Sequence, residues 1–370
     1  MKTSPKILLT NASHIYAGGE YYVLELAKEL TSRKIDVTVC CHTKNLLYDK
    51  CRSTGIKLFG LDFPEKGQLF KHIRKLRDYS RENEINIIHT NTNYDRTAGA
   101  FAARLAGIYH VAAVHSFQSI DNNLTQKFRN RKAVDLFVPC GYSVKDLLIK
   151  EDGISGEKIK VIHLGIDPET MKRIPELRQK IRNEFGIKDN EILIGNVGRL
   201  EEFKGQEYLI KAISLLRNYN NLKVMIVGDG RLEMFLKEFA DSCGVKDNFI
   251  FPLFRDDMQA IYSAFDIYAQ PSIEGGGETF PFSVLNSLAA GLPAVVTRVG
   301  DVAEMIVDGK TGYVVEEKDP VLLAERLQYL IDNENYNKEF GEAALQNLKA
   351  KFTLKKMTDN VINCYEDLLN

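Results

Sequence analysis

The chain has 370 residues, with 49 Lys and Arg against 50 Asp and Glu, which suits two domains of ordinary soluble composition. No apolar run reaches the roughly 18 residues of a membrane span, and the first apolar run is too short for the core of a signal peptide, so we expect a cytoplasmic protein. None of the six cysteines forms a C-x-x-C pair, which favours reduced thiols over disulfides or a metal site.

Charge is unevenly distributed along the chain. Residues 1–166 have a net charge of +8 and residues 167–370 a net charge of −9. A basic half joined to an acidic half indicates two domains with different partners. The basic half could meet an anionic membrane surface or an acidic acceptor, but its charge is too diffuse to indicate nucleic-acid binding.

Short apolar runs alternate with helical patterns along the first half. A helix is predicted at 20–30, where apolar residues recur at helical spacing. Strands are predicted at 6–10, 36–40, 85–89, 111–115, 135–139 and 159–163. Strands that alternate with helices form a parallel sheet covered on both faces, so residues 1–166 are predicted to form a Rossmann-like domain.

A polar, proline-bearing segment at 166–175 interrupts this pattern, which then restarts. Strands are predicted at 191–200, 222–230, 248–254, 266–272 and 294–300, with helices between them. Residues 167–350 are therefore predicted to form a second Rossmann-like domain. The expected fold class is α/β, with two doubly wound parallel sheets facing across a cleft. Two more helices are predicted in 333–370, and 351–370 could pack back onto the first domain.

Loops after strands are the expected ligand sites in such sheets. Gly18 and Gly19 precede the first helix, where backbone N–H groups and the helix dipole could hold an anion. The alternative is an ordinary turn in which Glu20 is stabilised at the helix start. Arg199 and Lys204 follow the first strand of the second half and could bind a diphosphate, or they could be solvated surface cations.

Two histidines end predicted strands. His115 could hydrogen-bond a substrate hydroxyl, although a histidine at the edge of the core is the simpler alternative, and His89 is a weaker candidate of the same kind. The segment VGDGRLE at 227–233 lacks the third glycine of the dinucleotide fingerprint. We therefore expect no nicotinamide site.

The stretch ETFPFSVLNSLAAGLP, residues 278–293, places a carboxylate just before a predicted helix. Pro281 suits the first turn, and Gly291 suits the end of the helix. Near the positive end of the helix, Glu278 would stay ionised and could accept hydrogen bonds from sugar hydroxyls, or it could be only a helix-start acid. Asn286 lies inside the helix, where a neighbouring loop could satisfy its amide.

Taken together, these motifs resemble the retaining glycosyltransferases of family 4 over nearly the whole chain. The segments that carry the resemblance are Ala17-Gly18-Gly19-Glu20 for the family's G-G-x-E, Gly198-Arg199 with Lys204-Gly205 for G-R-x-x-x-x-K-G, His115 for its strand-end histidine, VIHLGID at 161–167, and Glu278 with Asn286 to Pro293 for E-x7-E and the A-x-G-x-P after it.

The resemblance implies a GT-B fold whose first domain binds a glycan or lipid-linked acceptor and whose second binds a UDP- or GDP-sugar without a metal. Arg199 and Lys204 would neutralise the leaving diphosphate, and Glu278 and His115 would face the transferred sugar. Donor contacts would come from Gly18, Gly19, Thr279, Phe280, Pro281, Phe282 and Asn286. The implied reaction is a retaining hexosyl transfer in polysaccharide or glycolipid biosynthesis, with the acceptor deprotonated by the leaving phosphate.

Three positions depart from the family pattern. Asn286 replaces the second glutamate and carries no charge, which predicts weaker or differently selective nucleotide binding. Pro281 replaces a glycine that usually donates a backbone N–H. Leu253 stands where the family often has glycine, near the base site, so that the base preference cannot be carried over.

These departures leave two alternatives open: a non-catalytic nucleotide-sugar-binding relative, and a nucleotide-sugar epimerase on the same fold. A glycoside hydrolase is disfavoured, because Glu274 and Glu278, its closest pair of carboxylates, lie in a three-glycine loop that cannot fix their separation.

A basic amphipathic segment at 66–81 is the candidate for peripheral membrane contact. It interleaves Lys66, Lys71, Arg74, Lys75, Arg77 and Arg81 with Leu69, Phe70, Ile73 and Leu76. Such a helix can lie on an anionic surface. The alternative is a surface helix that packs its apolar side on the sheet.

Overall fold

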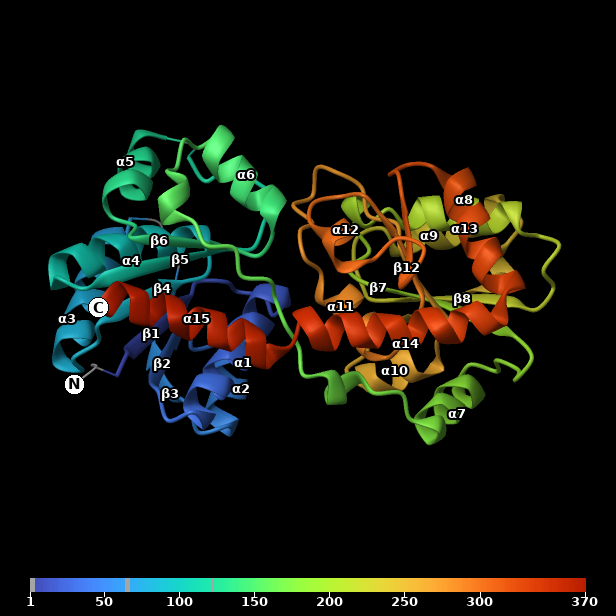
Figure 1. Ribbon diagram of the computed structural model, residues 1–370, viewed down its shortest axis with the longest axis horizontal. Coiled ribbons are helices and arrows are strands. Elements are labelled where there is room, and N and C mark those ends of the chain that lie inside the picture. The colour runs from blue at the N-terminus through green and yellow to red at the C-terminus, as the bar shows by residue number, and fades with distance from the viewer. Residues whose placement is uncertain (1–3, 64–66, 122) are drawn as a thin grey trace. The chain divides into compact units, whose positions relative to one another are not determined.

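The computed structural model describes residues 4–63, 67–121 and 123–370, and the chain divides into two compact units (Figure 1). The N-terminal unit comprises Met1–Leu164 and Leu354–Asn370, and the C-terminal unit comprises Gly165–Thr353. The last helix of the chain therefore belongs to the N-terminal unit.

The N-terminal unit is a parallel six-stranded sheet with the strand order β3-β2-β1-β4-β5-β6. Its elements are β1 (Lys6–Asn11), α1 (Gly18–Ser32), β2 (Asp36–Cys41), α2 (Leu46–Ser53), β3 (Lys57–Gly60), α3 (Leu69–Glu82), β4 (Ile87–Thr90), α4 (Asn93–Ala106), β5 (Tyr109–Val114), α5 (Leu124–Lys132), β6 (Leu136–Pro139), α6 (Tyr142–Lys150), η1 (Gly156–Lys158) and α15 (Leu354–Leu369). The strand order reverses between β1 and β4, so the loops that follow these strands flank the expected ligand position.

The C-terminal unit repeats this plan with the strand order β12-β11-β10-β7-β8-β9. Its elements are η2 (Pro168–Met171), α7 (Pro175–Glu184), β7 (Ile192–Val197), η3 (Glu202–Lys204), α8 (Gln206–Leu215), β8 (Leu222–Val227), α9 (Glu233–Ser242), η4 (Lys246–Asn248), β9 (Phe249–Leu253), α10 (Met258–Ala264), β10 (Ile267–Gln270), α11 (Phe282–Ala289), β11 (Ala294–Thr297), α12 (Val302–Met305), β12 (Gly312–Val315), α13 (Pro320–Asp332) and α14 (Glu334–Lys351). Two helix-flanked parallel sheets confirm the predicted α/β class.

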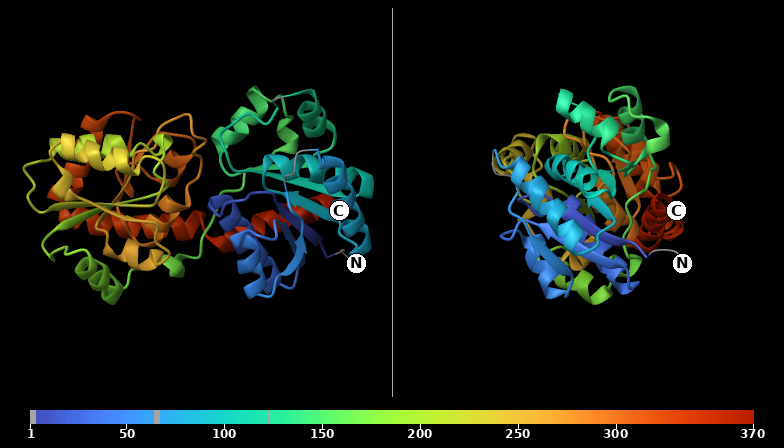
Figure 2. Two further views of the ribbon diagram at one scale, coloured as in Figure 1. Left: turned by 180° about the vertical axis from the view of Figure 1, so that it is seen from behind. Right: turned by 90° about the vertical axis from the view of Figure 1, so that its left-hand side faces the viewer.

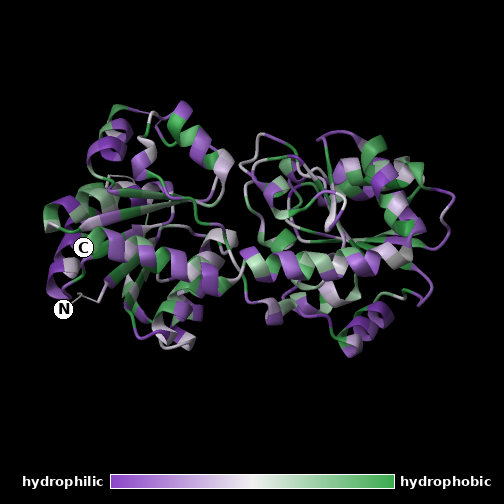
Figure 3. Cartoon of the chain, in the orientation of Figure 1, coloured by the Kyte–Doolittle hydropathy of each residue, from purple (hydrophilic) through white to green (hydrophobic). Residues whose placement is uncertain are grey.

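Burial explains both the strands and the helices. The central strands are buried along almost their whole length, as strands covered on both faces must be. The helices are amphipathic, and Figure 3 shows hydrophobic and hydrophilic residues alternating around them.

One predicted strand is wrong. Of the segment 159–163, only Ile159 forms a bridge, to Phe137 of β6. The backbone N–H groups of Lys160 and Ile162 donate to the carbonyls of Phe137 and Pro139, both at 3.0 Å. The segment 159–163 thus lies beside β6 and donates backbone hydrogen bonds to it. Its apolar residues cover the core, but it does not form a seventh strand of the sheet.

Helix α15 is fixed to the N-terminal unit by polar bonds as well as by packing. It lies beside α1 and is the red helix in front of this unit's sheet in Figure 1 and behind it in the left view of Figure 2. The Tyr365 hydroxyl lies 2.6 Å from Nδ1 of His89, and Asp359 accepts a 2.5 Å bond from Arg33 of α1. The end of the chain therefore completes the core of the unit that the start of the chain begins.

Three histidines are held neutral in the N-terminal unit. Burial lowers the pKa of His89 to about 3 and that of His115 to about 4, and it lowers the pKa of His110 well below its ordinary value. Nε2 of His110 lies 3.0 Å from the Thr90 hydroxyl. These side chains therefore act as uncharged hydrogen-bonding groups near neutral pH.

Acid is expected to destabilise this unit at pH values where carboxylates are still ionised. The unfolded chain binds protons at these histidines below about pH 6.5, whereas the folded chain does not until about pH 4 or lower. Between these values each histidine lowers the free energy of unfolding by about 1.4 kcal/mol per pH unit as pH falls. Urea unfolding, followed by circular dichroism between about pH 7 and about pH 5, measures this slope.

A pair of variants tests the assignment. His89→Gln removes one buried titrating group and should flatten the slope. Asn83→Gln changes an exposed side chain that does not titrate and should leave the slope as it is. An unchanged slope in His89→Gln would contradict the neutral, buried state of His89.

Candidate functional site

The loop from β7 to α8 brings two candidate cations to the carboxyl edge of the C-terminal sheet. Arg199 is exposed and Lys204 is buried. Both lie beside the ring of Phe203, with the guanidinium carbon 5.3 Å and the ammonium nitrogen 5.4 Å from its centroid. The two cations thus share one aromatic support, in the geometry of a cation–π contact.

Lys204 and Glu278 form a buried ion pair. The ammonium lies 2.5 Å from Oε2 of Glu278, and the two side chains are only 11% and 9% exposed. The Ser272 hydroxyl donates to the same oxygen at 3.0 Å. The structure therefore joins two residues to which the sequence analysis assigned separate tasks, and it adds Ser272, which the sequence analysis missed.

Glycines allow the loops to converge on this pair. Gly205 has φ +63°, and a Cβ there would lie 1.9 Å from the carbonyl oxygen of Pro271. Gly300 has φ +53°, and a Cβ there would lie 2.2 Å from the carbonyl oxygen of Glu278. Any side chain at either position would push the loops apart, so both glycines are required by the position of the pair.

The start of α11 carries the other candidate donor contacts. Thr279, Phe280 and Pro281 are buried, and Pro281 is the N-cap of the helix, with φ −70° and ψ 130°. Helix α11 thus begins at Phe282, one residue after Pro281.

Asn286, at the fifth position of α11, is half-buried. Burial raises the pKa of Tyr262 well above its ordinary value, and a side-chain hydrogen bond from Asn286 opposes that shift. The Tyr262 hydroxyl also donates to the carbonyl of Ser283 at 2.9 Å. Asn286 is therefore tied to the tyrosine behind α11, as expected of a polar helix residue satisfied by a neighbour.

Leu253 adopts a left-handed backbone conformation at the end of β9. Its φ is +63° and its side chain is 40% exposed. This conformation costs a leucine about 1–2 kcal/mol. The strain gives a physical reason for the glycine that the family resemblance leads us to expect at this position.

In the N-terminal unit, Gly18 and Gly19 begin α1, and Glu20 caps it. Glu20 accepts from the backbone N–H of Ala17 at 2.8 Å and from the Asn11 amide at 3.0 Å. The carboxylate is therefore occupied by the turn. A Cβ at Gly19 would meet nothing within 4 Å, so this loop leaves open space beside the helix start.

His115 follows β5 at the carboxyl edge of the N-terminal sheet. Its Nε2 lies 3.4 Å from Oδ1 of Asn91, and its ring lies 4.6 Å from that of Tyr22. The loop after β4 therefore supports His115 from one side. His89, by contrast, is fully buried against Tyr365 and is not a surface residue.

Helix α3 uses its apolar side for the core. Ile73 and Leu76 are buried, whereas Phe70 is 84% exposed next to Lys71 and Arg74. Lys66, the first cation of the predicted amphipathic segment, lies outside the described residues. Among the helices that the structure describes, none combines the length and apolar character needed to cross a bilayer.

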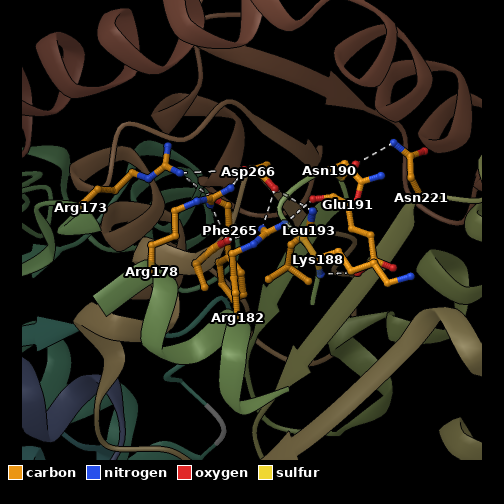
Figure 4. A network of polar contacts seen from close by, with 11 residues as sticks. Arg173, Arg178, Arg182, Lys188, Asn190, Glu191, Leu193, Asn221, Phe265 and Asp266 are labelled. Atoms are coloured by element: carbon orange, nitrogen blue, oxygen red, sulfur yellow. Dashed lines mark hydrogen bonds and ion pairs between the residues drawn. The ribbon is translucent and has the colours of Figure 1, made fainter. Parts of the chain in front are cut away.

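A second polar network lies at the opposite, amino edge of the C-terminal sheet (Figure 4). Asp266, just before β10, is 2.7 Å from Arg178 and 3.3 Å from Arg182, and it accepts a 2.8 Å bond from the backbone of Leu193. Arg173 donates to the carbonyl of Phe265 at 3.0 Å. The network borders a cavity of about 520 Å³ and fixes the starts of β7 and β10.

Comparisons with known proteins cover nearly the whole chain. The family described as "Glycosyltransferase Family 4" matches residues 16–170, and that described as "Glycosyl transferases group 1" matches residues 178–347. The chain is 24% identical to an uncharacterized glycosyltransferase of Methanocaldococcus jannaschii, over 77% of this chain and 76% of that one. It is 23% identical to the D-inositol 3-phosphate glycosyltransferase of Stackebrandtia nassauensis, over 77% and 69%.

Two solved structures share the fold. HepE of Anabaena in complex with UDP is similar at a TM-score of 0.88 and 21% identity, over 98% of this chain and 100% of that one. A glycosyltransferase from Rickettsia africae is similar at a TM-score of 0.91 and 20% identity, over 99% of each chain.

The strain at Leu253 predicts an inverted order of stability between two variants. Leu253→Gly should be more stable than Leu253→Ala by about 1 kcal/mol, because both lose the side chain and only glycine relieves the left-handed backbone. Phe235 of α9, which is 45% exposed, is the matched control. There the alanine variant should be the more stable by about 1 kcal/mol. Urea unfolding measures both pairs, and the same order at both sites would contradict the strain.

Proposed function

The chain belongs to the glycosyltransferases, with one half matching Glycosyltransferase Family 4 and the other matching Glycosyl transferases group 1. We propose that it transfers a hexose from a nucleotide-diphosphate sugar to a hydroxyl of a glycan or glycolipid, with retention of configuration. The observation that carries this proposal is the buried Lys204–Glu278 pair beside Arg199 at the carboxyl edge of the sheet. It offers cations for a diphosphate and a fixed carboxylate for sugar hydroxyls, side by side.

In the proposed reaction, Arg199 and Lys204 hold the diphosphate as negative charge develops on it. The carboxylate of Glu278 accepts hydrogen bonds from hydroxyls of the sugar. The bond between the anomeric carbon and the phosphate oxygen breaks, and the acceptor oxygen forms its bond on the same face. The acceptor proton goes to the leaving phosphate, so that no side chain serves as a general base and no metal is needed.

His115 takes part as a neutral group. Burial lowers its pKa to about 4, so the imidazole is uncharged at the pH of the cell and can exchange hydrogen bonds with a substrate hydroxyl without adding charge. We propose this role within the acceptor-binding N-terminal unit.

A UDP-sugar is the first donor to test, since the similar HepE structure contains UDP and another holds UDP-glucose. For this chain the donor contacts proposed are Gly18, Gly19, Thr279, Phe280, Pro281, Phe282 and Asn286. Asn286 would meet the ribose as a neutral amide, and Pro281 removes one backbone donor. Both changes favour weaker nucleotide binding than a second glutamate and a glycine would give.

A panel of UDP-, GDP- and ADP-glucose, each with EDTA, tests the proposal by thermal shift and by release of the nucleoside diphosphate. We expect one donor to raise the melting temperature and to be slowly hydrolysed. Arg199→Ala combined with Lys204→Ala should lower turnover at least about a hundredfold, the loss typical of removed oxyanion donors. Lys237→Ala, which removes a cation paired with Glu233 on α9, should leave turnover unchanged.

Two other outcomes would contradict transfer, and a third would contradict the mechanism. Binding without release would favour a non-catalytic relative. A changed sugar without an acceptor would favour an epimerase. Unchanged turnover in the double variant would exclude the proposed role of the two cations.

We further propose that the N-terminal unit contacts anionic membranes through α5 more than through the segment 66–81. Leu124 and Phe128 lie one turn apart on α5 and are 85% and 60% exposed. Lys127 and Arg131 lie on the same side by helical spacing and are also exposed. An exposed apolar pair flanked by cations suits an anionic lipid surface.

Flotation with vesicles of phosphatidylglycerol and phosphatidylcholine at low salt tests this contact. Leu124→Ser combined with Phe128→Ser should reduce the bound fraction several-fold, roughly the effect of losing two apolar anchors. The matched control, Phe70→Ser on α3, should retain most of the binding. If only Phe70→Ser loses binding, the membrane contact lies in the segment 66–81 and not in α5. If the wild-type protein does not float with the vesicles, neither site binds the membrane.

A further inference from the structure

We propose that Gln270 and Ser272 are positioning residues for Glu278, and that they hold its carboxylate in place when Lys204 turns to the diphosphate. The inference rests on the proposed function, because it assigns a task within the same reaction. It is carried by a chain of hydrogen bonds that lies beneath Glu278 in the C-terminal unit.

This hydrogen-bond chain begins at Tyr268 in the core and ends at the carboxylate of Glu278. The Tyr268 hydroxyl donates to Oε1 of Gln270 at 2.7 Å. Nε2 of Gln270 donates to Oγ of Ser272 at 2.8 Å, and Ser272 donates to Oε2 of Glu278 at 3.0 Å. Tyr268, Gln270 and Ser272 are all fully buried.

The direction of the chain is fixed by its donors. The Ser283 hydroxyl also donates to Oε1 of Gln270, at 3.2 Å, so this oxygen accepts from two hydroxyls. The amide nitrogen must then face Ser272, whose single hydrogen is left to donate to Glu278. Burial raises the pKa of Tyr268, which keeps its hydroxyl a donor at every working pH.

Core stability does not call for this arrangement. β10 is a central strand between β7 and β11, where apolar residues would pack at least as well. A buried amide and hydroxyl are unfavourable unless every polar atom is paired. The hydrogen-bond chain pairs the Gln270 amide and the Ser272 hydroxyl in an order that ends at the carboxylate of Glu278. This is the pattern expected of residues that hold that carboxylate in place.

The proposed reaction gives the support its purpose. In the free protein, Oε2 of Glu278 accepts from both Lys204 and Ser272. If the ammonium moves toward a diphosphate, the bond from Ser272 remains and keeps the carboxylate oriented toward the sugar. Gln270 and Ser272 therefore act through Glu278 and do not touch the substrate themselves.

The deciding variant is Gln270→Glu, because it keeps the size and shape of the side chain and replaces the amide NH₂ group with a carboxyl oxygen. A protonated glutamic acid can accept from Tyr268 and donate to Ser272, whereas its ionised form cannot donate and repels Glu278. Burial raises the pKa of such a carboxyl, so the support should be intact at low pH and lost at high pH. We expect kcat to be close to wild type near pH 6 and about tenfold lower near pH 8.5.

Three further variants separate positioning from folding. Thr297→Val removes a hydroxyl that lies 2.5 Å from the backbone carbonyl oxygen of Ser272 and 3.3 Å from that of Gln270 but is not a member of the side-chain hydrogen-bond chain to Glu278. It should lower the melting temperature and keep the wild-type pH profile. Ser272→Ala should weaken UDP-glucose binding about tenfold while changing UDP binding little, because Glu278 faces the sugar, and Ser272→Thr should restore it.

The assay uses hydrolysis and binding of UDP-glucose, or of whichever donor in the panel the wild-type chain turns over. If wild type turns over none, the proposed function fails and the positioning role fails with it. If wild type is active and Gln270→Glu has the wild-type pH profile, only the positioning role is overturned. Equal losses of UDP and UDP-glucose binding in Ser272→Ala would also overturn it.

Discussion

A buried ion pair organises the carboxyl edge of the C-terminal unit. Taking an ammonium and a carboxylate out of water costs several kcal/mol per ion, and well-packed apolar residues of similar size are often at least as stable. The Lys204–Glu278 pair is therefore poorly explained by stability. The proposed reaction explains it better, because that reaction uses a cation and an anion that lie within hydrogen-bonding distance of each other before any ligand arrives.

The surrounding backbone follows from that requirement. Gly205 and Gly300 stand where a Cβ would strike the carbonyl of Pro271 or Glu278, so loops from three strands can close around one pair of charges. Strand β10 is held at both ends, by Asp266 and its arginines at the start and by Gln270 and Ser272 at the finish. A strand fixed at both ends in this way limits the movement of the Glu278 carboxylate that follows it.

Much of this could be predicted from the sequence, and the remainder has identifiable physical causes. Apolar periodicity predicts most of the buried strands correctly. It misses β3 and β12, which are four-residue strands that are only partly buried, and it wrongly predicts a strand at 159–163. Periodicity reports burial, and burial does not distinguish a strand from a covering segment. Arg199, Lys204 and Glu278 were identifiable because they follow strands. The ion pair between Lys204 and Glu278, which are 74 residues apart, could not be predicted. Gln270 was not identified because it lies inside a predicted strand. No local pattern marks the backbone strain at Leu253.

The chain passes between the two units twice, at residue 164 and again at residue 353. Within the C-terminal unit, the first and last residues lie close together, since the backbone N–H of Ile166 donates to the carbonyl of Phe352 at 3.1 Å. On the ribosome, the first 164 residues emerge long before α15, which supplies Tyr365 to their core. The unit that is synthesised first must therefore wait for the last residues of the chain, and the C-terminal unit is the first that can fold to completion.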